Sequence, residues 1–163
     1  MKEIKKFFTE TLSSVWYMGF AFLFGLIAML MMFAPAFYNT CVGFRPYAAT
    51  EVFFDAAGGL VKGAWPAFLG YMLVTLGFVA TGIIALPIIR PSAKLEKVIL
   101  IGSVICEFAG LILVSLILVE YNGFNNVASE IAAKSYLKGG TISFIVFDIL
   151  TMCSTAMAAL LDW

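Results

Sequence analysis

Four long runs of apolar residues divide the chain, and shorter, more polar connections separate them. The runs cover roughly residues 14–35, 65–89, 98–119 and 141–161. About 20 helical residues, each rising 1.5 Å, span the ~30 Å hydrocarbon core of a bilayer. Only a helix or a closed barrel satisfies its backbone hydrogen bonds in lipid. The pattern predicts an all-α integral membrane protein, residues 1–163 forming a single domain, with four transmembrane helices packed as an antiparallel bundle.

The connections contain weaker helical patterns. Two longer connections, 36–64 and 120–140, are predicted to form loops on the outer side, each with a short amphipathic helix, at 49–57 and 126–137. No strand is expected. Before the first run, the apolar residues Ile4, Phe7, Phe8 and Leu12 recur at helical spacing. This pattern favours either an amphipathic helix in the membrane interface or a straight extension of the first transmembrane helix.

The basic residues are distributed unevenly over the two sides that this layout defines. Six of the ten lie in two short segments on one side: Lys2, Lys5, Lys6, Arg90, Lys94 and Lys97. The remaining four are spread over the two longer loops: Arg45, Lys62, Lys134 and Lys138. The positive-inside rule therefore predicts that both termini and the 90–97 connection are cytoplasmic. The lysine-led N-terminus and compact loops favour a bacterial plasma membrane.

Composition supports a membrane protein and disfavours enzymes. Hydrophobic residues make up 63% of the chain and charged residues 12%, and the formal net charge is zero. The expected surroundings are the lipid bilayer, and no nucleic-acid partner is expected. The chain has no histidine, the commonest general base and metal ligand. We therefore expect no catalytic residues, no bound metal, no cofactor and no enzymatic activity.

The cysteines and the first apolar run allow two further expectations. Cys106 and Cys153 lie inside apolar runs, whereas Cys41 lies alone in a loop. Cys41 is expected either as an unpaired thiol or as a partner for a cysteine of another chain. The triplet Ala34-Pro35-Ala36 resembles a signal-peptide cleavage site. The apolar run before it is longer than the 7–15 residues of a signal peptide, so we expect it to remain as a membrane anchor.

Small residues should mark the faces where the helices meet. Transmembrane helices associate through close backbone approach, because lipid is as apolar as a leucine side chain. The residues expected at such contacts are Gly25, Gly77, Gly102, Cys106 and Gly110. The last three follow each other at four-residue spacing on one predicted helix.

Two carboxylic acids inside the apolar runs are the sharpest functional candidates. Glu107 lies near the middle of the third run, and Asp148 lies about 12 Å into the fourth. Both fall at similar depth on neighbouring helices, although the sequence does not fix the rotation of either. Polar side chains accompany them on the same helices: Ser103, Thr151 and Thr155. A charged side chain at this depth costs at least ~2.5 kcal/mol.

Three interpretations of these acids remain open. In the first, at least one is neutral and hydrogen-bonds a neighbouring helix as part of the structure. In the second, the pair shares a proton or binds a cation during transport. In the third, one or both face a partner subunit that supplies an arginine or lysine. No basic residue of this chain lies in the predicted membrane core, so an internal salt bridge is excluded.

The layout resembles the tetraspan proteins, claudins among them, in topology alone. Those proteins also have cytoplasmic termini and two outer loops. The loop at 36–64 has one cysteine, Cys41, and lacks the Gly-Leu-Trp of claudins, and the chain lacks the Cys-Cys-Gly of tetraspanins. No family membership follows.

The sequence favours a small polytopic membrane protein that acts through association. It would form a homo-oligomer or serve as a non-enzymatic subunit with other membrane proteins. The alternative is a small cation- or proton-coupled transporter or channel that uses Glu107 and Asp148.

Overall fold

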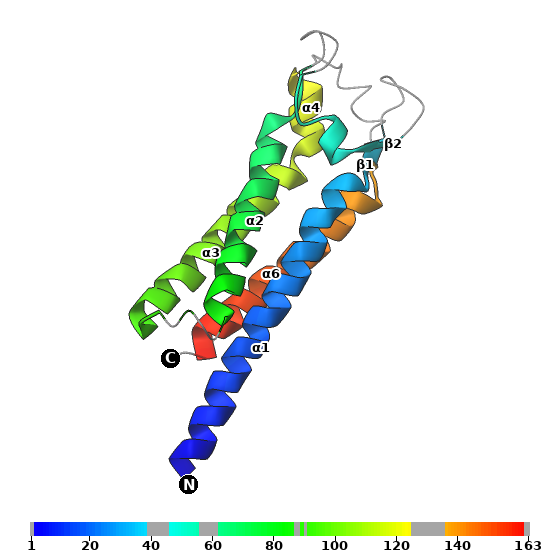
Figure 1. Ribbon diagram of the computed structural model, residues 1–163. Helices are drawn as coiled ribbons and strands as arrows, with labels where there is room; N and C mark the ends of the chain where they lie inside the picture. Colours follow the sequence, from blue (N-terminus) through cyan, green and yellow to red (C-terminus); the bar gives the residue numbers. More distant parts are fainter. Residues whose placement is uncertain are drawn as a thin grey trace.

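The computed structural model describes residues 2–38, 46–55, 62–86, 89, 91–124 and 136–161. The chain is mostly helical (Figure 1). Its helices are α1 (Lys2–Leu30), α2 (Trp65–Ala85), α3 (Ala93–Ser115), α4 (Ile117–Phe124) and α6 (Gly139–Leu161), with short 3-10 helices η1 (Met31–Phe33) and η2 (Ala49–Glu51). Four of these helices contain segments long and apolar enough to cross a membrane: Ser14–Phe33, Trp65–Ile84, Ala93–Ser115 and Gly139–Leu161. By this criterion the chain is a membrane protein.

The helix boundaries follow from local chemistry at their ends. Ser92 caps α3, because its hydroxyl accepts a hydrogen bond from the Leu95 N–H at 3.4 Å. The helix therefore begins in a polar segment, before the apolar run predicted from residue 98. Leu86 is extended, as expected for a residue that precedes proline, so α2 ends at Ala85 rather than at residue 89. The segment before the first apolar run belongs to α1. Of the two alternatives given by the sequence, the structure therefore has the straight extension of the first transmembrane helix.

A small sheet replaces helix in the described parts of the two longer loops. Strands β1 (Pro35–Tyr38), β2 (Pro46–Ala48) and β3 (Tyr136–Leu137) form an antiparallel sheet in the order β2-β1-β3. The expectation of no strand is therefore wrong. Of the helix predicted at 49–57, the structure has only the 3-10 turn η2; the other, at 126–137, lies outside the described residues except for β3. The sheet lies at one end of the long helices, here called the sheet end, and both chain ends lie toward the other, the termini end (Figure 1).

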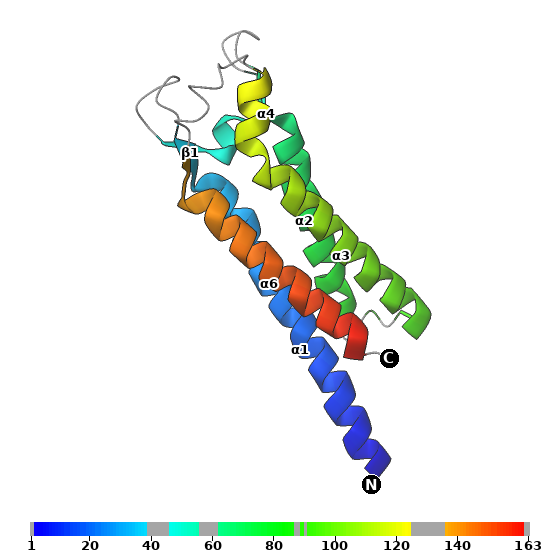
Figure 2. The same ribbon diagram turned by 180° about the vertical axis from the view of Figure 1, so that it is seen from behind.

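Each long helix packs mainly against two others. The most extensive contacts join α2 to α3 and α1 to α6, and α1–α2 and α3–α6 contacts join these two pairs. Figure 2 shows α6 side by side with the later part of α1, whose N-terminal part extends beyond α6, as does the opposite view in Figure 1. Between α1 and α2, a Cβ at Gly25 would overlap Phe78, and a Cβ at Gly82 would overlap Phe22. The two helices thus approach through reciprocal glycine–phenylalanine contacts.

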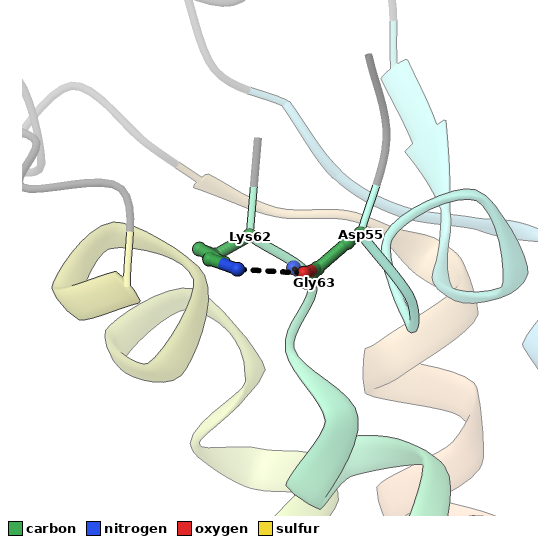
Figure 3. Close-up of polar contacts among 3 residues, drawn as sticks. All are labelled: Asp55, Lys62 and Gly63. Atoms are coloured by element: carbon green, nitrogen blue, oxygen red, sulfur yellow. Dashed lines mark hydrogen bonds and ion pairs between the residues drawn. The ribbon is translucent and has the colours of Figure 1, made fainter. Parts of the chain in front are cut away.

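The connection before α2 is held by a short polar contact (Figure 3). Lys62 Nζ donates to Asp55 Oδ2 at 2.8 Å, and the Gly63 N–H donates to Asp55 Oδ1 at 3.1 Å. Both hydrogen bonds lower the pKa of the Asp55 carboxyl, and the bond from Lys62 has the larger effect. A Cβ at Gly63 would lie 2.5 Å from the Phe54 backbone, so this close turn requires glycine.

Candidate functional site

Glu107 and Asp148 are both buried in the interior between the helices. Each side chain has 0% of its surface exposed, Glu107 on α3 and Asp148 on α6. α3 and α6 pack against each other. The structure therefore places both acids, which the sequence put at similar depth, in the same helix interior.

Glu107 has one partnered and one unpartnered oxygen. Thr155 Oγ1 donates to Glu107 Oε1 at 3.3 Å, which links α6 to α3. Glu107 Oε2 is buried and has no hydrogen-bond partner among the described residues. A Cβ at Gly77 on α2 would lie 2.8 Å from Glu107 Cγ and 3.0 Å from Oε1. The missing side chain at Gly77 thus provides the space that Glu107 occupies.

Asp148 has fewer hydrogen-bond partners than Glu107 among the described residues. Neither Oδ1 nor Oδ2 has a hydrogen-bond partner among the described residues. Thr151, one turn along α6, donates its hydroxyl to the Phe147 carbonyl oxygen at 2.8 Å, and Thr155 also donates to the Thr151 carbonyl oxygen. Ser103 on α3 is buried, and its hydroxyl has no described partner. The site thus has three unpartnered carboxyl oxygens and one unpartnered hydroxyl.

The residues expected at helix contacts lie in different surroundings. Gly25, Gly77 and Gly110 face other helices so closely that a Cβ on any of them would overlap a neighbour, at 2.4–2.8 Å. A Cβ at Gly102 would meet nothing within 4 Å. Cys106 is half-buried and Cys153 exposed, whereas Cys41 lies outside the described residues. The four-residue series on α3 therefore contacts α2 closely at Gly110 and not at Gly102.

Three further buried polar groups were not singled out as site residues in the sequence. The Tyr71 hydroxyl on α2 and the Ser14 hydroxyl on α1 are buried without described partners, as is Glu120 Oε2 on α4. The Ala67 N–H, in the first turn of α2, donates to the Glu120 carboxylate. Burial raises the pKa of Glu120 to about 7, and this hydrogen bond lowers it in part. For Glu120, the one indication of a buried polar group in the sequence was an acid immediately after an apolar run.

Comparison with known proteins adds no assignment. No family model, curated protein or solved structure matches this chain. What the site can do must therefore be argued from its own chemistry.

Oxygen atoms alone form this site. Among the described residues, no group of three or more histidine, cysteine, aspartate or glutamate side chains could hold a metal ion. Two carboxyls and two hydroxyls can hold a proton, or a small cation that prefers oxygen ligands. Pockets lie between α1 and α2, between α3 and α6, and beside β1, and neither acid lines these. Both acids are fully buried and so are enclosed by protein.

Proposed function

We propose that this protein moves a proton or a small cation across a membrane, using Glu107 and Asp148 as one binding site. Its four transmembrane helices form an antiparallel bundle with both termini in the cytoplasm, in a bacterial plasma membrane. The helix contacts described above support the bundle, and the uneven distribution of lysine and arginine supports the orientation. No enzymatic activity is part of this proposal.

The observation that carries the proposal is the unpartnered state of the acid pair. Two fully buried carboxyls lie on helices that pack against each other, and three of their four oxygens have no described hydrogen-bond partner. Buried polar groups are normally hydrogen-bonded, because leaving one unpaired costs ~1–3 kcal/mol and more when it is charged. A purely structural pair would be expected to satisfy more of these oxygens.

The charge balance indicates what the site binds. In the described membrane-spanning segments, basic residues occur only at Lys94 and Lys97, in the first turns of α3. Glu107 lies ten residues beyond Lys97, about 15 Å along the helix. Two like charges this close in the interior repel each other and lose their hydration. A bound proton or cation would reduce both the repulsion between the carboxylates and the cost of their lost hydration.

A second function, association with another membrane subunit, has its own support. Gly102 has no close neighbour within the chain, and Cys106, one turn further on α3, is half-buried. Small, half-buried residues that leave this space suit close contact with a helix of another chain. Association and transport are compatible, since many transporters act as oligomers.

Transport is tested with purified protein in liposomes that carry gradients of H⁺, Na⁺ or K⁺. The wild type is expected to move at least one of these ions faster than protein-free liposomes. Glu107→Gln and Asp148→Asn each keep the shape of the side chain but remove its ionisation. Both variants should fall to the rate of protein-free liposomes, because the site no longer gains and loses charge.

The matched control is Glu96→Gln, the same chemical change in the first turn of α3. It should transport like the wild type. Circular dichroism and size-exclusion chromatography establish that each variant is folded. Wild-type protein with no flux of any ion, or folded acid variants with wild-type flux, would leave association as the function.

A further inference from the structure

The unpartnered buried polar groups extend well beyond the acid pair. They come from five helices: Glu120 on α4, Tyr71 on α2, Asp148 on α6, Glu107 and Ser103 on α3, and Ser14 on α1. Each contributes at least one buried oxygen with no hydrogen-bond partner among the described residues. Contacts between the helices place these groups in order along the interior.

In the half of the molecule near the sheet end, the order runs from Glu120 to Asp148. The Ala67 N–H donates to the Glu120 carboxylate, which places Glu120 beside the first turn of α2. Tyr71 lies one turn further along α2, and its ring packs on Phe144 with centroids 4.5 Å apart. Asp148 lies one turn beyond Phe144 on α6. Along the helix axes, each step thus includes an advance of about one turn, ~5.4 Å, from Ala67 to Tyr71 and from Phe144 to Asp148.

In the other half, the order continues from the acid pair to Ser14. Ser103 precedes Glu107 by one turn of α3, and a Cβ at Gly77 would meet both of these residues. The next turn toward the termini end is apolar: Met18, Ile84, Leu100 and Ala158 form a cluster of buried residues. Ser14 lies one turn beyond Met18 on α1. This apolar cluster therefore separates Ser14 from the rest of the polar series.

We propose that these side chains form a proton path through the bundle, running from Glu120 through Tyr71, Asp148, Glu107 and Ser103 to Ser14, and that the cluster around Leu100 closes it toward the cytoplasm. This inference rests on the proposed function and narrows its substrate to the proton. Water molecules that bridge neighbouring oxygens complete the path when the apolar cluster opens.

The chemistry of the series favours a proton over a larger ion. A sodium or potassium ion needs several oxygen ligands at every step, whereas a proton needs only one acceptor and one donor at a time. Between Glu120 and Asp148, the described series offers one hydroxyl, that of Tyr71, flanked by the Phe144 ring. In each passage one proton enters from water at the sheet end, one leaves at the termini end, and the acid pair returns to its starting protonation.

The titratable groups that face the acid pair are few. Among the described residues of α1, α2, α3 and α6 that surround the acids, the titratable side chain toward the sheet end is Tyr71, whose ring packs on Phe144, one turn before Asp148. Lysines 94 and 97 lie at the far start of α3. The basic side chains of the described membrane-spanning segments therefore lie at least ten residues from Glu107 along α3.

Two single-atom deletions test the path. Tyr71→Phe and Ser103→Ala each remove one hydroxyl oxygen and leave both acids intact. Proton flux is measured with a pH-sensitive dye inside liposomes under an imposed membrane potential. Each variant is expected to conduct protons about tenfold more slowly, the effect of losing one hydrogen-bonded step.

A polar group placed in the apolar cluster tests the closure. Leu100→Ser adds a hydroxyl and space for water between Ser103 and Ser14, and it should raise the proton flux about tenfold, as expected if the barrier falls by one hydrogen bond. Ile101→Ser is the matched control, because Ile101 is the next residue and is 52% exposed. It should conduct like the wild type. Sodium flux is recorded throughout, because a general leak would raise it as well.

The results separate the path from the function on which it rests. If the acid variants lose transport but Tyr71→Phe and Ser103→Ala conduct protons like the wild type, the path is wrong and the acid site stands. Transport of sodium or potassium without protons would also overturn the path. If the acid variants retain every flux, the proposed function itself fails. A slower proton flux in both deletion variants, together with a faster proton flux and an unchanged sodium flux in Leu100→Ser, would support the path.

Discussion

Gly110→Leu is expected to separate α2 from α3 and to destabilise the protein severely. A Cβ at Gly110 would lie 2.5 Å from the Gly70 carbonyl oxygen and 2.6 Å from a Val74 methyl group. The carbonyl oxygen belongs to the backbone and cannot move away as a flexible side chain could. Overpacking a tight contact costs up to roughly 3 kcal/mol, and this contact belongs to one of the two most extensive helix interfaces. The loss is measured by thermal or denaturant unfolding in detergent micelles.

Gly102→Leu is the matched comparison on the same helix. A Cβ there meets nothing within 4 Å, so the added side chain has space. Replacing a helical glycine by leucine should itself stabilise the helix by up to ~1 kcal/mol. The stability of this variant should therefore equal or exceed that of the wild type in the monomer. Equal losses of stability in the two variants would show that the α2–α3 contact is not as close as described.

Phe144→Ala should have a comparably large effect, by leaving a cavity instead of overpacking. Phe144 is 0% exposed on α6, and its ring packs on Tyr71 of α2. Truncating a fully buried phenylalanine costs about 3–5 kcal/mol. The lost pairing with Tyr71, worth ~0.5–1.5 kcal/mol, is part of this cost. Unfolding in micelles should therefore occur at a much lower temperature or denaturant concentration than in the wild type.

Phe108→Ala removes the same side chain from a position that is 54% exposed on α3. In a bilayer this ring faces lipid, so lipid can fill the space it leaves. We expect its unfolding to stay close to that of the wild type. A Phe144 variant as stable as the Phe108 variant would contradict the packing of α6 against α2.

The hydrophobic pattern predicted the membrane-spanning helices because burial in lipid depends on length and polarity, which a sequence displays directly. It missed the sheet because the partners of β1 are only two or three residues long, and one of them, β3, lies about 100 residues further along the chain. Short strands are stabilised by their cross-strand neighbours, so the residues within the strand itself give no clear pattern that predicts it. The segment Pro35–Tyr38 therefore looked like the end of a helix and the start of a loop.

The sequence singled out two acids that are buried in the structure, but it did not predict their geometry. The depth of Glu107 and Asp148 follows from counting residues, whereas their mutual approach depends on the rotation of α3 and α6. The glycines of α3 show the same limit. Four-residue spacing drifts by ~40° per step on a helix with 3.6 residues per turn, so Gly102 and Gly110 point ~80° apart. The sequence presented them as one stripe, and only Gly110 contacts α2 closely.

The central claim is that Glu107 and Asp148 act as one site, and infrared spectroscopy of the protein in lipid nanodiscs tests it most directly. The carboxyl stretching band of each acid is assigned by its loss in Glu107→Gln or Asp148→Asn. Interacting acids titrate as a pair, so replacing one changes the titration of the other. We expect the Glu107 band to titrate at a different pH once Asp148 is asparagine, and the reverse. Two bands that titrate identically with and without the other acid would contradict the shared site.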